Sequence, residues 1–248
     1  MTNKLAVFDF DSTLMDGETL EILVREIDNG KNTPHPNPLP QGARENLQEK
    51  ELDFCRVGKA LAYPQQGLAE KVKAITDRAM RGELDFFESL TERVSYLKGL
   101  PVSKVDEICH NLPLMNGAET VVKGLQEKGY KVVCFSGGFR NATAYFRDKI
   151  GLDGEFANIL HVKDGLLTGQ VGGEMMFNNS KGEMLKRLQK LLNVTKENTL
   201  TVGDGANDLS MFKYAGIRIA FCAKPIVKEN ADIVIEEKNL SKILDFIN

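Results

Sequence analysis

The sequence contains few of the residues that build redox or zinc sites. Its 248 residues include only four cysteines and three histidines. No two cysteines form a C-x-x-C pair, and none stands beside a histidine at the spacing of metal ligands, so neither kind of site is predicted. Cys134 and Cys222 lie in apolar runs, where we expect reduced and buried thiols.

A basic excess and a long apolar run are also absent. The formal net charge is −3, which argues against a nucleic-acid partner, and no apolar run approaches the roughly 20 residues that span a bilayer. The first apolar stretch ends in Asp9 and Asp11 with no small-residue cleavage site after it, unlike a secretory signal. We therefore expect a cytoplasmic protein that needs no nucleic acid, membrane or obligate protein partner.

Short apolar runs rich in Val, Ile and Phe recur along the chain and predict strands that are covered on both faces. These runs are Lys4–Phe8, Lys131–Phe135, Thr199–Val202, Arg218–Phe221 and Asp232–Ile235. Helical spacing appears between them, at Ala118–Lys128, Ala142–Lys149 and Lys181–Leu192. This alternation predicts an α/β fold with a doubly wound parallel sheet. In addition, Asn158–Val162 and Leu167–Val171 flank a turn that contains Asp164-Gly165 and predict a β-hairpin.

Residues 16–100 show helical patterns but no convincing strand. The patterns are Glu18–Asp28, Leu68–Met80 and Phe86–Leu97. We expect a small helical cap domain inserted after the first strand, with residues 1–15 and 101–248 as the core. Such an insert would overhang the strand ends and could act as a lid.

Within the cap, residues 29–66 form a distinct insertion. Thr33–Gly42 holds four of the eight prolines, and alternating prolines disfavour helix and strand alike. We expect a flexible, extended loop that neither the fold nor the activity of the protein requires.

Reactive side chains follow three of the predicted strands. Because ligands bind at the carboxyl ends of the strands in open α/β sheets, these side chains should meet in one site. Asp9 and Asp11 come directly after the first strand, and a tight turn could aim both carboxylates at one pocket. That pair suits a nucleophile and a general acid and base, although a D-x-D alone is more often a surface turn or a helix cap.

The second and third strand ends offer ligands for phosphate and metal. Ser136-Gly137-Gly138 provides a hydroxyl and freely oriented backbone N–H groups, which suit phosphate oxygens. Gly203–Asp208 gathers two carboxylates and an amide where a helix could begin, and such oxygen ligands suit Mg²⁺. Lys181 could bind phosphate and offset the repulsion between phosphate and Asp9.

Taken in order, these motifs resemble the four motifs of the haloacid-dehalogenase superfamily of phosphatases. The matching segments are Asp9–Thr13, Ser136–Gly138, Lys181 and Gly203–Asp208. Further segments resemble the branch of that superfamily that hydrolyses phosphoserine, namely Ala79–Phe86, Leu97–Leu100 and Ala220–Pro225. The resemblance covers nearly all of residues 4–248 and fails only at about residues 29–66, where the family's loop is much shorter.

The resemblance implies a two-step phosphoryl transfer. Asp9 would form an aspartyl-phosphate while Asp11 protonates the leaving hydroxyl, and Asp11 would then activate water. Mg²⁺ would be held by the carboxylates of Asp9 and Asp204 and by the backbone carbonyl of Asp11, with Asp208 supporting the metal shell. The residues implied to neutralise or bind the phosphate are Lys181, Ser136, Gly137 and Asn207.

The resemblance also implies O-phospho-L-serine as the substrate and the last step of L-serine biosynthesis as the reaction. Glu18 would meet the substrate ammonium and Arg93 its carboxylate, because an arginine fork can bind two oxygens. Met80 and Phe86 would cover the site and exclude water. From their positions alone, Met80 and Phe86 are more often core residues, and Glu18 is an ordinary first-turn acid.

Three other functions stay open on the sequence. The first is a phosphatase for another small ester, such as phosphohomoserine or phosphothreonine. The second is a phosphate-binding or scaffold protein without catalysis, against which the presence of a nucleophile argues. The third is a phosphotransferase that passes the phosphoryl group to another acceptor.

Overall fold

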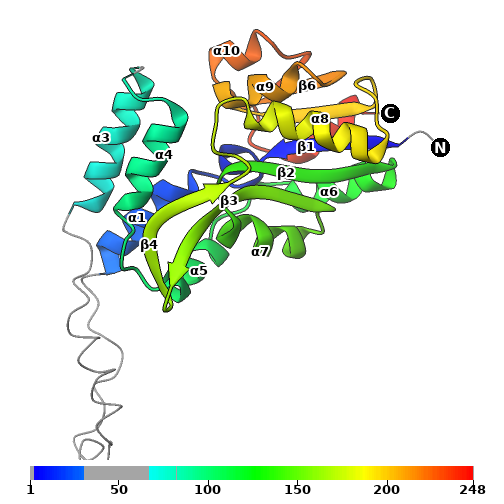
Figure 1. Ribbon diagram of the computed structural model, residues 1–248. Helices are drawn as coiled ribbons and strands as arrows, with labels where there is room; N and C mark the ends of the chain where they lie inside the picture. Colours follow the sequence, from blue (N-terminus) through cyan, green and yellow to red (C-terminus); the bar gives the residue numbers. More distant parts are fainter. Residues whose placement is uncertain (1–2, 31–66, 82, 248) are drawn as a thin grey trace, which may run out of the picture.

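A twisted seven-stranded sheet forms the centre of the computed structural model, which describes residues 3–30, 67–81 and 83–247 (Figure 1). The strand order is β4-β3-β2-β1-β5-β6-β7. Neighbouring strands are parallel except for β3 and β4, so the predicted doubly wound α/β sheet is confirmed. The strands are β1 Lys4–Asp9, β2 Tyr130–Phe139, β3 Gly154–Lys163, β4 Leu166–Gly173, β5 Thr199–Gly203, β6 Ile217–Phe221 and β7 Ile233–Ile235.

The predicted hairpin is present, and both of its strands are longer than the apolar runs. Lys163 pairs with Leu166 across a two-residue turn. The turn residues Asp164 and Gly165 both have positive φ, at 52° and 77°, which is the geometry that a tight hairpin turn of matching twist requires. The sequence Asp-Gly therefore explains the turn.

The predicted end of the second strand, at Phe135, is wrong. The sequence placed Ser136-Gly137-Gly138 after the second strand, whereas β2 runs on through Phe139. The register with β3 shifts between Phe135 and Phe139, so the strand is irregular there. Small residues permit this bulged backbone, which carries the serine and glycines into the site without a turn.

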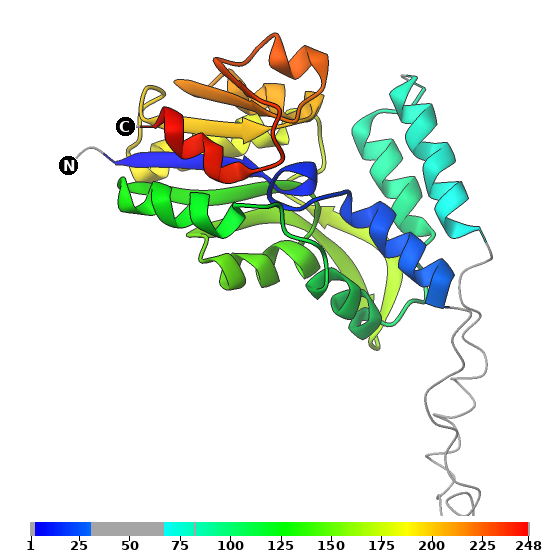
Figure 2. The ribbon, with the colours of Figure 1, turned by 180° about the vertical axis from the view of Figure 1, so that it is seen from behind.

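Helices cover both faces of the sheet, as Figures 1 and 2 show. One face carries α6, α7 and a C-terminal 3₁₀ helix, with α5 packed on α7; the other face carries α8 and α9. These helices are α5 Val102–His110, α6 Ala118–Glu127, α7 Arg140–Ile150, α8 Ser180–Leu192, α9 Leu209–Phe212, α10 Pro225–Lys228 and the 3₁₀ helix Leu240–Phe246. Of these, α6, α7 and α8 were predicted, whereas α5, α9, α10 and the 3₁₀ helix were not; the other predicted helices correspond to α1, α3 and α4.

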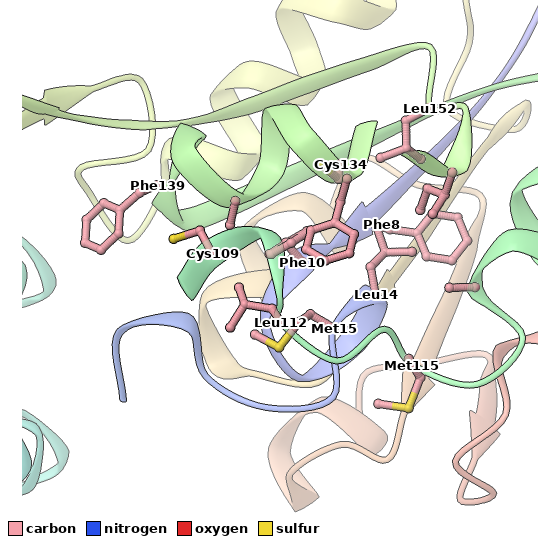
Figure 3. Packing of buried hydrophobic residues seen from close by; sticks show 14 of the residues in the cluster. Phe8, Phe10, Leu14, Met15, Cys109, Leu112, Met115, Cys134, Phe139 and Leu152 are labelled. Carbon is pink, nitrogen blue, oxygen red and sulfur yellow. The ribbon is translucent and has the colours of Figure 1, made fainter. Parts of the chain in front are cut away.

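Alternating burial along the strands produces two core layers. In β1, Ala6 and Phe8 belong to the cluster under α5, α6 and α7, while Leu5 and Val7 belong to the cluster under α8 and α9. Figure 3 shows Phe8 and Cys134 within the first cluster. A strand buried on both faces needs apolar side chains at every position, which explains its unbroken apolar sequence.

Three further helices, α1 Thr19–Gly30, α3 Leu68–Met80 and α4 Phe86–Ser95, form a layer to one side of the sheet (Figure 1). They pack on one another, and α4 also packs against β4. Their apolar faces join the first core cluster, so this layer is continuous with the core. The helix α4 begins with a capping box in which Asp85 and Glu88 satisfy each other's backbone N–H groups.

Several expectations concern residues outside the described ranges. The proline-rich stretch, Cys55 and the side chain of Met80 lie there. Cys134 is a buried free thiol, as expected, whereas Cys222 is only partly buried; Cys109 is also buried and free. Among the described residues, no helix is long and apolar enough to cross a membrane.

Candidate active site

The ends of β1, β2 and β5 and the helices α1, α3 and α4 enclose a cavity of about 530 Å³. β1 lies between β2 and β5 in the sheet, so its last residue, Asp9, stands at the centre of this edge. The predicted site residues whose atoms line the cavity are Asp9, Asp11, Glu18, Phe86, Arg93, Gly137, Asp204 and Asn207. Residues separated by almost 200 positions in the chain therefore share one cavity.

Lys181 is buried beneath the cavity and joins two acids. Its Nζ lies 2.6 Å from Oδ1 of Asp9 and 2.6 Å from Oδ1 of Asp208. Burial raises the pKa of Asp9 well above its ordinary value, and the charge of Asp208 raises it further, against the opposing effect of Lys181. The two carboxylates outweigh the burial of Lys181 and raise the pKa of its ammonium, which stays charged.

Asp208 anchors the loop that follows β5. Its Oδ2 accepts hydrogen bonds from the backbone N–H groups of Asp204 and Gly205, both at 3.0 Å. A Cβ at Gly203 would lie 2.3 Å from the same oxygen, so only glycine fits there. Since both oxygens of Asp208 are engaged, its role here is to fix the loop and Lys181.

Asp204 stands over the cavity beside the other acids. Burial, and then the charge of Asp208, raise the pKa of Asp204 to about 6. Thr13 donates a hydrogen bond of 3.3 Å to Oδ1 of Asp204. Thr13 was not predicted as a site residue, although it lies within the first motif.

A cation fits among these acids. Oxygen atoms of Asp9, Asp204 and Asp208 lie within 4.8 Å of one another, and burial raises the pKa of Asp9 and of Asp204. Clustered, partly desolvated carboxylates repel one another unless a positive charge intervenes. Carboxylate oxygens are the ligands that Mg²⁺ prefers, and Asp9 and Asp204 have oxygens to offer, because Asp208 is already engaged.

Asp11 points its carboxylate at two neighbours rather than at this cluster. Its Oδ1 accepts hydrogen bonds from the backbone N–H of Thr19, at 2.7 Å, and from the Thr19 hydroxyl. Its Oδ2 accepts from Ser136 Oγ at 3.0 Å. A metal contact from Asp11 would therefore come from its backbone carbonyl. Thr19 was also not singled out from the sequence, which carries no signal for this contact.

The irregular end of β2 forms the floor of the cavity. Ser136 is buried and its Oγ accepts a hydrogen bond of 2.8 Å from Gly138 N–H. A Cβ at Gly137 would lie 2.8 Å from the ring of Phe86, so glycine is needed where α4 approaches the strand. Asn158 supports this segment by donating 3.0 Å to the carbonyl of Gly137.

Glu18, just before α1, and Arg93, on α4, both line the cavity. Glu18 accepts a hydrogen bond of 2.9 Å from Ser12 Oγ. The side chain of Glu18 is open to the cavity but surrounded by protein, and desolvation, with the charge of Asp11, raises its pKa to about 7. Arg93 donates from Nε to the carbonyl of Ser89, and desolvation lowers its pKa. The cavity thus offers a carboxylate and a guanidinium in addition to the acids at the strand ends.

Comparisons with known proteins agree with this geometry. Residues 3–216 match the family of haloacid dehalogenase-like hydrolases. A phosphoserine phosphatase of Wolinella succinogenes is 50% identical over 97% of this chain and 98% of its own length. That of Methanocaldococcus jannaschii is 43% identical over 98% of this chain and 97% of its own length.

Solved structures are similar over the whole chain. A phospho-aspartyl intermediate analogue of phosphoserine phosphatase aligns with a TM-score of 0.79 at 43% identity, covering 100% of both chains. A substrate-bound phosphoserine phosphatase complex aligns with a TM-score of 0.79 at 42% identity, again over 100% of both chains. The chain therefore belongs to the haloacid dehalogenase-like hydrolases and, among them, to the family of the phosphoserine phosphatases.

Proposed function

We propose that this protein is a Mg²⁺-dependent phosphatase that hydrolyses O-phospho-L-serine to L-serine and phosphate through an aspartyl-phosphate. One observation carries the proposal: the ion-paired Asp9 lies in the same cavity as Glu18 and Arg93. A nucleophile thus faces a pair of opposite charges that can bind an amino acid's ammonium and carboxylate. The relatives named phosphoserine phosphatase, at 43% and 50% identity, support the choice of substrate.

Asp9 is the proposed nucleophile. Its position at the end of the central strand β1 would fix it for in-line attack on a phosphoryl group. Lys181, 2.6 Å away, favours the ionised form of Asp9 and lowers its repulsion with the dianionic phosphate. The backbone at Ser136 and Gly137, with Asn207, is the proposed cradle for the phosphate oxygens.

Asp11 is the proposed general acid and then general base. It would protonate the serine oxygen as the bond to phosphorus breaks, and would later take a proton from the water that hydrolyses the aspartyl-phosphate. Its carboxylate is held by hydrogen bonds on both oxygens, so it is oriented before the substrate arrives.

The carboxylates of Asp9 and Asp204 and the backbone carbonyl of Asp11 would hold Mg²⁺, and Asp208 would support that shell by fixing the loop. When bound, Mg²⁺ supplies positive charge that neutralises the phosphoryl oxygens. The repulsion among these acids when no cation is present favours such an ion.

The layer of α1, α3 and α4 is the proposed cap domain, and it would choose the substrate. Glu18 would bind the ammonium and Arg93 the carboxylate, while Phe86, at the floor near Gly137, would exclude water. Met80 is proposed for the same role on the family resemblance alone. We also propose that the reaction takes place in the cytoplasm as the last step of L-serine formation.

The test is release of inorganic phosphate from L-phosphoserine, with Mg²⁺ and with a chelator. Asp9→Asn should abolish release, whereas Asp148→Asn, at an exposed acid on α7, should leave it unchanged. If phosphate is released faster from phosphothreonine or phosphohomoserine than from L-phosphoserine, that ester is the substrate and the proposed mechanism still holds. Phosphate release by Asp9→Asn at the wild-type rate would refute the nucleophile.

A further inference from the structure

Thr19 joins the first helix of the cap layer to the acid of the first motif. It is the first residue of α1, and its side chain is 2% exposed. Both its backbone N–H and its hydroxyl donate to the same oxygen, Oδ1 of Asp11. The two donors leave Oδ1 little freedom to rotate toward a substrate.

The other oxygen of Asp11 has a different environment. Oδ2 accepts from Ser136 Oγ at 3.0 Å, and a Cβ at Gly138 would lie 3.1 Å from it. Oδ2 therefore lies beside the end of β2, where the phosphate cradle is proposed. The two oxygens are thus held by different parts of the protein, Oδ1 by α1 and Oδ2 by β2.

The hydrogen-bond donors around Asp11 determine which of its two oxygens can carry a proton. A backbone N–H can donate but cannot accept, so Oδ1 must keep a lone pair toward Thr19 N–H. Ser136 Oγ can rotate its hydrogen away and accept a hydrogen bond instead. A proton on Oδ2 is therefore compatible with its surroundings, whereas a proton on Oδ1 would face the Thr19 N–H group, which cannot turn away. The Thr19 hydroxyl keeps Oδ1 on this side.

We propose that Thr19 is a positioning residue that makes Oδ2 the oxygen of Asp11 that transfers protons. This inference rests on the proposed function of Asp11 as general acid and base. In the first step, a bond forms from Asp9 to phosphorus, the bond from phosphorus to the serine oxygen breaks, and the proton on Oδ2 moves to that oxygen. In the second step, the oxygen of a water molecule bonds to phosphorus, the water gives one proton to Oδ2, and the bond from phosphorus to Asp9 breaks, which releases phosphate.

The substitution Thr19→Val tests this role, because valine has the same shape but lacks the hydroxyl. Thr19→Ser keeps the hydroxyl and should restore activity. Thr143→Val is a matched control: Thr143 is also buried and donates to a carboxylate, that of Glu155 on β3, at 2.7 Å.

The measurement is the single-turnover rate of enzyme phosphorylation with two substrates. Phosphoserine has a poor leaving group that needs protonation, whereas the leaving group of p-nitrophenyl phosphate needs little. Since general acid catalysis contributes about 10²–10⁴-fold, we expect Thr19→Val to slow phosphorylation by phosphoserine roughly 10–100-fold. The rate with p-nitrophenyl phosphate should fall less than about threefold, and KM for phosphoserine should barely change.

Equal losses on both substrates would overturn the proposal, as would a wild-type rate with phosphoserine. If Thr19→Val does not fold, Thr19→Ala carries the same comparison, because it also removes the hydroxyl and keeps the N–H. If the wild-type protein does not release phosphate from phosphoserine, the proposed substrate fails. The leaving-group comparison is then made with the alkyl phosphate that the enzyme does hydrolyse, so the two failures are distinguishable.

Discussion

Phe87 of α4 stacks on Phe177 of the segment before α8, with ring centroids 5.4 Å apart and planes at 11°. Both rings are partly open to solvent, with Phe87 40% and Phe177 59% exposed. The neighbouring Phe86 reaches Gly137 at the cavity floor, and Asn178 lines the cavity. The stacked pair therefore ties the proposed cap to the core at the edge of the site.

Loss of this stacked pair should weaken substrate binding. Aromatic pairs contribute about 0.5–1.5 kcal/mol beyond their burial, so we expect Phe87→Ala or Phe177→Ala to raise KM for phosphoserine about 2–10-fold. The double variant should be little worse than either single one, since each removes the same contact. Phe246→Ala, at an exposed ring of the C-terminal 3₁₀ helix, is the control. Additive effects of the two substitutions would contradict the coupling.

Removal of the buried lysine should destabilise the fold in a pH-dependent way. Lys181→Met leaves Asp9 without its partner, and breaking a buried ion pair costs about 3–5 kcal/mol. Burial already raises the pKa of Asp9, so the folded variant takes up a proton more readily than the unfolded chain. The variant should therefore regain stability as the pH falls from 8 to 5.

Urea unfolding in the presence of a chelator measures this effect. Lys186→Met removes an exposed lysine from the same helix, α8, and should change stability by less than about 0.5 kcal/mol at any pH. An equal loss of stability for Lys181→Met at pH 8 and at pH 5 would show that Asp9 does not carry the effect.

Substrate binding should depend on the charge of Glu18. Its pKa is raised to about 7, so the carboxylate is ionised above that pH and neutral below it. An ammonium binds the ionised form, and KM for phosphoserine should therefore rise as the pH falls from 8 to 6. In Glu18→Gln this dependence should flatten and KM should be high throughout. A KM profile of the variant that matches the wild type would exclude Glu18 as the ammonium ligand.

Much of the fold could be predicted from the sequence because the strands are buried on both faces. Runs such as Lys4–Phe8 stand out because every residue from Leu5 to Phe8 is apolar, and the hairpin has its Asp-Gly turn. The end of β2 could not be predicted, because Gly137 and Gly138 signal a turn when read locally. Pairing of the flanking residues with β3, the hydrogen bond from Asn158 to the carbonyl of Gly137 and the close approach of Phe86 keep that segment in the sheet.

The site residues could be predicted where acids directly follow strands. They could not be predicted where a contact joins residues that are far apart in the chain or belong to no motif. Asp9 and Asp204 could be placed by the rule that ligands gather at strand ends. The hydrogen bonds of Thr19 to Asp11, and the stacking of Phe87 on Phe177, depend on how α1 and α4 pack over the sheet. No periodicity or spacing in the sequence encodes that packing.

The proline-rich insertion should be dispensable, because the structure brings its two ends together. Asp28, in the last turns of α1, accepts hydrogen bonds from the N–H groups of Leu68 and Ala69, at 3.3 Å and 2.8 Å. This carboxylate holds the start of α3 beside α1, so a short connection can span the gap. Helix–helix connections in compact domains are commonly about 2–8 residues long.

Deletion of residues 31–63 leaves residues 64–67 to join α1 to α3. A shorter connection lowers the entropy cost of closing the loop by up to about 2 kcal/mol, so the shortened chain should unfold at the same or a higher urea concentration. Its kcat/KM for phosphoserine should stay within about threefold of the wild type. A chain with residues 31–63 in scrambled order is the control and should behave as the wild type does. Loss of folding or of activity in the deletion, with the scrambled chain active, would mean that the presence of this segment supports the cap. Loss of folding or of activity in both chains would mean that the particular sequence of this segment supports the cap.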